Sequence, residues 1–209
     1  MTALATLMFE LVTSRLADFH LGAGNAYLAL PITFLGLALG SMHVHSRPMI
    51  VERFKPIVAL AVLAGICFSA MLLVFIVFSR FLPVVSIFDV TANRLYLLYK
   101  TLTFIAVLLF PFYYFGRILT VAYQIKREEI GAIYSADFWG AALAGAITPV
   151  LFHFGGLPNV TLVLFGLVFL PVVIFFRGAP AQRALLGLSL FATCLIGQQV
   201  IAAMDNSLN

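Results

Sequence analysis

The side chains best suited to chemistry in this sequence are ionisable groups that stand inside long apolar runs. Asp137 lies within the run Ile130 to Phe154, which holds no other Asp, Glu, Lys or Arg. A carboxylate at that depth needs a cationic partner, several hydrogen-bond donors or a proton. Arg117, near the end of the preceding run, is the first candidate partner. Asp137 is therefore predicted either to bind a cation or relay protons, or to clamp two helices together.

A second pair of ionisable groups, Glu10 and Arg15, lies in the first apolar run. Residues three or four apart stack best on one face of a helix, and these two are five apart. They are predicted either to pair across a turn or with another helix, or to lie at the depth of the membrane interface. In the second case their charged ends would extend toward water.

Signals for metal binding, cofactor binding and catalysis are missing. His43 and His45 form a His-x-His pair beside a basic stretch, but no carboxylate or cysteine stands nearby at ligand spacing. The sequence contains no GxGxxG, Walker A, GxSxG or HExxH motif. We therefore predict no catalytic residue, no metal site and no cofactor.

Composition places the helices that carry these residues in a membrane. Of the 209 residues 63% are hydrophobic and only 10% are charged, and the mean hydropathy is +1.11. A soluble chain of this composition could not cover its own surface, and about 20 apolar residues suffice for one span. We predict an all-α integral membrane protein, a polytopic bundle of about seven transmembrane helices in a single domain. The predicted spans are residues 2–19, 25–42, 56–79, 95–123, 130–154, 160–176 and 184–204.

Charge between the spans predicts an orientation. The net charge is +4, and the basic residues are scattered singly rather than gathered in a stripe, so we expect a lipid bilayer and not nucleic acid as the partner. With a cytoplasmic N-terminus the inside loops hold Arg47, Arg53, Lys55, Lys126, Arg127, Arg177 and Arg183, and the outside loops hold Arg80 and Arg94, with Lys100 close by at the outer end of a span. The positive-inside rule favours this arrangement. The expected location is the bacterial inner (plasma) membrane.

Small residues at helical spacing indicate close packing. Gly36 and Gly40 form a GxxxG pair, and Gly140 and Ala144 repeat the spacing in a later run. Such faces let helices approach closely in lipid, where dispersion replaces the hydrophobic effect. They are predicted to pack helices within one bundle, or alternatively to form a homodimer contact.

Two blocks of residues follow one another in an order that is specific when they are taken together. The first is Glu10-Leu-Val-Thr-Ser-Arg15-Leu, then Gly22, then Phe34-Leu-Gly36-Leu-Ala-Leu-Gly40-Ser41. The second is Gly116-Arg117, then Glu129-Ile-Gly131-Ala-Ile-Tyr134-Ser-Ala-Asp137-Phe-Trp-Gly140-Ala-Ala. Over most of residues 8–156 they resemble the N-terminal membrane domain of the membrane-fused spermidine synthases, which are polyamine aminopropyltransferases.

The resemblance implies a membrane fold loosely like one half of a major-facilitator transporter. In that family a soluble Rossmann domain normally follows and carries the catalytic residues, and none of those residues has a counterpart here. We therefore expect a non-catalytic subunit or scaffold that binds other membrane subunits. One alternative is transport or binding of a cationic metabolite such as a polyamine. Another is the membrane part of a split or truncated aminopropyltransferase.

Overall fold

The computed structural model describes residues 2–21, 26–46, 56–81, 94–125 and 127–175, and all regular structure in these ranges is helical. The all-α prediction is confirmed for this part of the chain. The last predicted span, residues 184–204, lies outside it. The elements are α1 (Thr2–Leu21), η1 (Ala26–Leu28), α2 (Ala29–Ser46), α4 (Pro56–Phe81), α6 (Arg94–Ile125), η2 (Arg127–Glu129) and α7 (Ile130–Phe175).

Within these ranges four helical segments are long and apolar enough to cross a membrane. They are Ala26–Ser46, Ala59–Phe78, Leu98–Ile125 and Ile130–Gly156. Helix α1 is absent from this set because Glu10, Arg15 and Asp18 lower its hydropathy. Its apolar side nevertheless lies at the centre of the bundle, where Phe9 and Val12 are fully buried.

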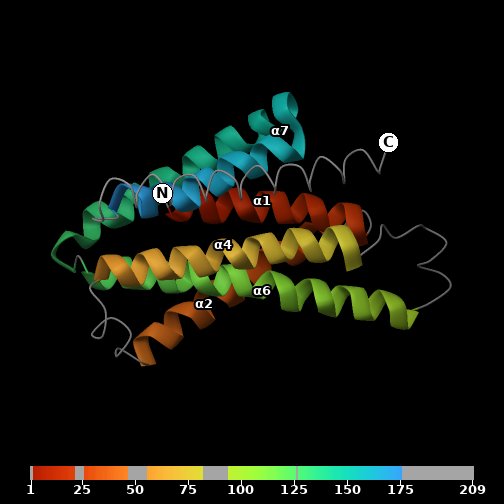
Figure 1. Cartoon of the computed structure of the whole chain (residues 1–209), viewed down its shortest axis with the longest axis horizontal. Helices are drawn as coiled ribbons and strands as arrows, with labels where there is room; N and C mark the ends of the chain where they lie inside the picture. Colours follow the sequence, from red (N-terminus) through yellow and green to blue (C-terminus); the bar gives the residue numbers. More distant parts are fainter. Residues whose placement is uncertain (1, 22–25, 47–55, 82–93, 126, 176–209) are drawn as a thin grey trace.

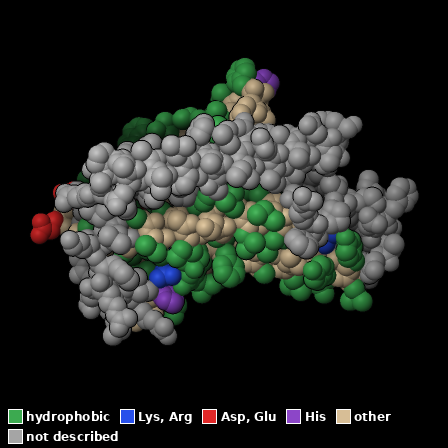
Figure 2. Space-filling view, viewed as in Figure 1, with side chains coloured by type: hydrophobic (Ala, Val, Ile, Leu, Met, Phe, Trp, Pro, Cys, Tyr) green, Lys and Arg blue, Asp and Glu red, His purple; other side chains and the backbone are tan. Residues whose placement is uncertain are grey.

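The helices run up and down along one long axis (Figure 1). Helix α1 packs on α7, α2 packs on α6, and α4 contacts both α6 and α7. The starts of α1, α4 and α7 and the ends of α2 and α6 lie at the left end of the bundle in Figure 1. On the face seen in Figure 2, the coloured charged side chains lie toward the two ends, and hydrophobic side chains spread over the middle. This distribution suits a bilayer whose headgroups meet the two ends.

Helix α7 is interrupted by a sharp reversal at Gly156. Gly156 has φ 62° and ψ −175°, a conformation that only glycine adopts readily. The chain turns back there, so that α7 forms a helical hairpin whose tip projects from the bundle (Figure 1). The sequence signals for a turn, Gly155 to Asn159, stand at this place.

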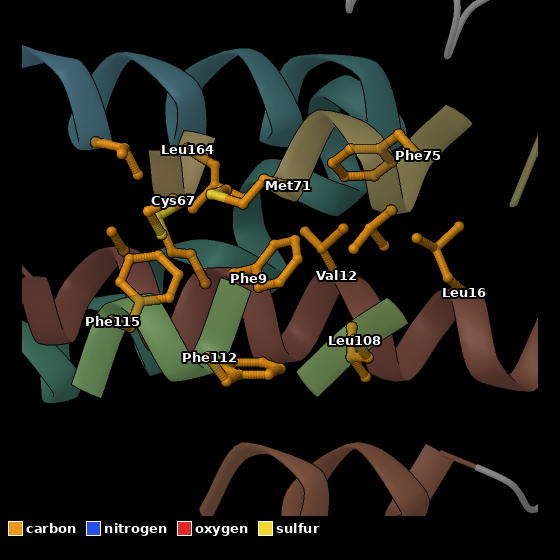
Figure 3. Close-up of a cluster of buried hydrophobic side chains, with 14 of the residues drawn as sticks. Phe9, Val12, Leu16, Cys67, Met71, Phe75, Leu108, Phe112, Phe115 and Leu164 are labelled. Atoms are coloured by element: carbon orange, nitrogen blue, oxygen red, sulfur yellow. The ribbon is translucent and has the colours of Figure 1, made fainter. Parts of the chain in front are cut away.

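The core is built around the aromatic ring of Phe9. Its centroid lies 5.3 Å from that of Phe112, 6.3 Å from that of Phe115 and 6.4 Å from that of Phe75. Tilted and edge-on arrangements at these separations are favourable for aromatic rings. Figure 3 shows side chains from α1, α4, α6 and α7 meeting in this cluster. Helix α1 is thereby held against three neighbours despite its charged residues.

Helix α2 is longer than the predicted span. It continues through His43 and His45 to Ser46, whereas the sequence analysis ended this span at Met42. Residues two apart on a helix point about 200° apart, so the two imidazoles cannot face the same metal ion. His43 instead packs edge-on against Tyr113 of α6, with a centroid separation of 5.9 Å. The extra turn exists because α6 offers it a packing surface.

Candidate functional site

Asp137 of α7 lies beside the start of α1, although the two are far apart in the sequence. The backbone N–H of Ala3 donates to its Oδ1 at 3.3 Å, and the hydroxyl of Tyr123 donates to the same carboxylate. The first N–H groups of a helix have no partner within the helix, and their dipoles favour an anion. Asp137 of α7 therefore caps α1 from outside.

This finding corrects the expected partner of Asp137. Arg117 does not pair with it within the described residues. The guanidinium carbon of Arg117 instead lies 5.6 Å from the ring centroid of Tyr113 and 5.7 Å from that of Tyr114. Its Nε is buried and has no hydrogen-bond partner in the described structure. A cation over aromatic faces is stabilised by the ring quadrupoles but stays charged.

Asp18 plays the same part as Asp137 at another helix start. Its Oδ1 accepts a 3.0 Å hydrogen bond from the backbone N–H of Ala26, the first residue of η1, which leads into α2. The sequence analysis did not select Asp18. The available signal was an acidic residue shortly before the Gly-rich break and the next apolar run. Sequence alone does not show that such a residue folds back onto the following helix.

Glu10 and Arg15 form no ion pair with each other in the described part of the chain. Glu10 is half-buried and Arg15 is exposed, both on α1. The hydroxyl of Thr13 donates to the carbonyl oxygen of Glu10 at 2.9 Å, a bond made by the backbone and not by the carboxylate. Pairing across a turn, one form of the first predicted arrangement, is therefore absent among the described residues, and the other predicted arrangements stay predictions.

Lys100 is the most deeply buried cation among the described residues. Only 1% of it is exposed, and its Nζ lies 4.7 Å from the ring centroid of Tyr96, one turn earlier in α6. The sequence analysis placed Lys100 only near the outer end of a span. Its burial depends on how α6 packs against its neighbours, and the pattern of charges along the sequence does not predict that packing.

Gly36 and Gly40 lie where α2 crosses α6. A Cβ on Gly36 would stand 2.5 Å from Cβ of Phe112, and one on Gly40 would meet the carbonyl oxygen of Tyr113 and stand 3.0 Å from N of Arg117. Gly116 is the counterpart on α6, and a Cβ there would press on the backbone of Leu37. Glycines on both helices thus allow a near backbone-to-backbone contact.

Gly140 and Ala144 lie where α7 crosses α1. A Cβ on Gly140 would stand 3.4 Å from N and 3.6 Å from Cβ of Leu4, and Ala144 is fully buried. Because Asp137 precedes Gly140 by one helical turn, the close crossing and the cap on Ala3 belong to one contact. All four small residues selected from the sequence are engaged inside this bundle.

The arrangement can hold helices together and can present surfaces to lipid or to other chains. Its two best-placed carboxylates, Asp18 and Asp137, already accept hydrogen bonds from helix starts. Within the described ranges no group of three His, Cys, Asp or Glu residues could hold a metal ion. Comparison of the chain with protein-family models, curated proteins and solved structures found no match.

Proposed function

We propose that this protein is a non-catalytic, spermidine-synthase-like membrane domain that serves as a subunit or scaffold of a larger membrane complex. In this proposal seven helices cross the bacterial inner membrane and the N-terminus is cytoplasmic. The helix ends that flank the basic stretches 47–55 and 126–127 lie at the same end of the bundle, which supports this orientation.

The observation that carries the proposal is the bare face of α7. In the most apolar 18-residue stretch of Ile130–Gly156 only 17% of the residues are buried, against 33% to 39% in the corresponding stretches of the other three candidate spans. Ser135, Trp139, Ala142 and Ala146 are exposed at spacings of four, three and four residues, and so share one side of the helix. This face combines small residues with a large aromatic ring, which suits the crossing of another helix.

Two large aromatic rings on this side of α7 are left uncovered. The side chains of Trp139 and Phe138 are each 67% exposed, and a large exposed apolar surface marks a site of contact with a protein or a membrane. A partner helix would cover both rings.

The placement of Asp137 supports assembly over transport of a cationic metabolite. Its carboxylate accepts hydrogen bonds from Ala3 N–H and Tyr123, and binding an amine would require breaking this cap. If the protein carries a polyamine, vesicles that contain it should take up radiolabelled spermidine, and Asp137→Asn should abolish that uptake. The remaining alternative, a split aminopropyltransferase, is a form of the scaffold proposal in which the partner is a catalytic chain.

Co-isolation in mild detergent tests the proposal. Ala142→Leu places a large side chain on the α7 face, and Ala38→Leu makes the same change at an exposed position of α2. We expect the unmodified protein to retain a partner, Ala142→Leu to lose it by about tenfold, a loss of about 1.4 kcal/mol, and Ala38→Leu to keep it. A monodisperse, partner-free monomer from native membranes would contradict the assembly role. Equal retention by both variants would contradict the α7 face.

A further inference from the structure

The cluster around Arg117 is a cationic feature that the assembly proposal leaves unexplained. No described residue supplies a hydrogen bond or an ion-pair partner to its guanidinium, although Arg117 stands within a membrane span. Of the three guanidinium nitrogens only Nε is both buried and without a hydrogen-bond partner, so the two terminal nitrogens reach the surface. An anion at this place would stabilise the cation, and the described residues supply none.

The position of Arg117 along α6 puts it at the level of lipid headgroups. Helix α6 has 32 residues, a length of about 48 Å, and so exceeds a hydrocarbon layer of about 30 Å by about 18 Å. If both ends share the excess, about 9 Å of helix extends past each boundary. Arg117 precedes the final residue, Ile125, by eight positions, or about 12 Å, and therefore lies just inside the boundary. An arginine side chain spans the remaining distance.

The neighbours of Arg117 orient the guanidinium and add donors. The rings of Tyr113 and Tyr114 lie under it, and His43 of α2 packs edge-on against Tyr113. The hydroxyls of Ser41 and Thr120 lie 2.8 Å apart one turn away, at the same α2–α6 contact. In Figure 2 a basic side chain and a histidine are both visible at the surface at the lower left, where α2 leaves the bundle.

We propose that Arg117, Tyr113 and His43 form a binding site for the phosphate of an anionic phospholipid in the leaflet that the ends of α2 and α6 face. A guanidinium donates two parallel hydrogen bonds to a phosphate, and cation–π contact with the rings of Tyr113 and Tyr114 holds it in place. A phosphate bound side-on at a terminal nitrogen also offers an oxygen to Nε. Basic sites between membrane helices are suited to acidic headgroups.

Native mass spectrometry of the full chain tests this site. The probes are dioleoyl phosphatidylglycerol, dioleoyl phosphatidylcholine and inorganic phosphate. We expect the anionic lipid to be retained about tenfold more strongly than the zwitterionic one. Arg117→Gln should remove this preference, Arg117→Lys should keep part of it, and Arg15→Gln should leave it within about twofold. Arg15→Gln is the matched control because it removes an exposed guanidinium from another helix.

A second measurement, in a Cys194→Ala chain that keeps Arg117, does not depend on how the Arg117 variants fold. Phosphatidylglycerol should raise the temperature at which the buried thiol of Cys67 becomes reactive, and phosphatidylcholine should not. Equal retention of the two lipids, or equal loss in Arg15→Gln and Arg117→Gln, would overturn the proposal. Inorganic phosphate binding as tightly as the lipid would overturn the lipid as ligand. Release of a co-purified protein by Arg117→Gln, with lipid retention unchanged, would show that the anion is a carboxylate of that protein.

Discussion

Replacing Gly40 by alanine tests how closely α2 and α6 approach. The added methyl group would meet the carbonyl oxygen of Tyr113 and would stand 3.0 Å from the carbonyl carbon of Tyr113 and from N of Arg117. All three are backbone atoms, so no rotamer change can relieve the contact. Carbon atoms rest at about 3.5–4.0 Å, and the still closer contact with the carbonyl oxygen means that the two helices must separate by about 1 Å or more.

The cost of this separation follows from a matched comparison. Overpacking of a well-packed interface costs about 1–3 kcal/mol. Alanine is also the better helix former, by about 0.5–1 kcal/mol. Gly65→Ala on α4 has the same propensity gain, and its Cβ would meet nothing within 4 Å. The difference between the two variants therefore isolates the packing cost, about 1–3 kcal/mol.

The assay uses the thiol of Cys67, which is fully buried beside the carbonyl of Pro111. In a Cys194→Ala background, heating in detergent with a fluorogenic maleimide reports unfolding through this thiol. Each kcal/mol moves the midpoint by about 2–4 °C for a chain of this size. We expect Gly40→Ala to unfold below the unmodified chain, and Gly65→Ala to unfold at or above its midpoint. Identical midpoints for the two variants would refute a backbone-to-backbone contact between α2 and α6.

The same assay checks three further predictions. Gly116→Ala should also lower the midpoint, because its Cβ would stand 2.8 Å from Cα of Leu37; an unchanged midpoint would speak against the reciprocal contact. Asp137→Asn should cost less than Asp137→Leu, because asparagine still accepts from the first turn of α1, while leucine leaves the half-buried N–H of Ala3 without an acceptor, a loss of at most about 1–3 kcal/mol. Equal losses would show that the cap contributes nothing. Phe9→Ala should lose about 3–5 kcal/mol, whereas Phe154→Ala, at a side chain that is 83% exposed, should match the unmodified chain; similar midpoints would contradict the position of the core.

The existence of most helices could be predicted from the sequence because lipid imposes a simple rule. A segment that crosses hydrocarbon must be apolar and must satisfy its own backbone, so long uncharged runs predict helices. The rule does not predict turns that packing adds at a helix end. An example is the last turn of α2, with His43 and His45, where His43 packs against Tyr113 of α6. It also ranks α1 below the other helices, because charge lowers its hydropathy although its apolar side is central to the core.

The partners of the site residues could not be predicted, because they depend on which helices are neighbours. The spacing of Gly36 and Gly40 predicts a close helix crossing. Which helix they cross, and that Gly116 lies opposite them, is known only from the fold. Asp137 needs hydrogen-bond donors, and charge alone suggests Arg117 as its partner. The chain places α7 beside α1, so that the nearest donor is the N-terminus of a helix.

Capping gives two carboxylates on the described helices hydrogen-bond donors at the starts of other helices. A helix start within the bundle has N–H groups that must find acceptors, and a carboxylate in hydrocarbon must find donors, so each removes the cost of burying the other. Asp137 does this for α1 and Asp18 for the segment that leads into α2. Arg117 has no such protein counterpart in the described helices, since the last carbonyls of α6 lie two turns further on. In the proposal its anion comes from the membrane, and the lipid-retention experiment tests that source against a carboxylate of another chain.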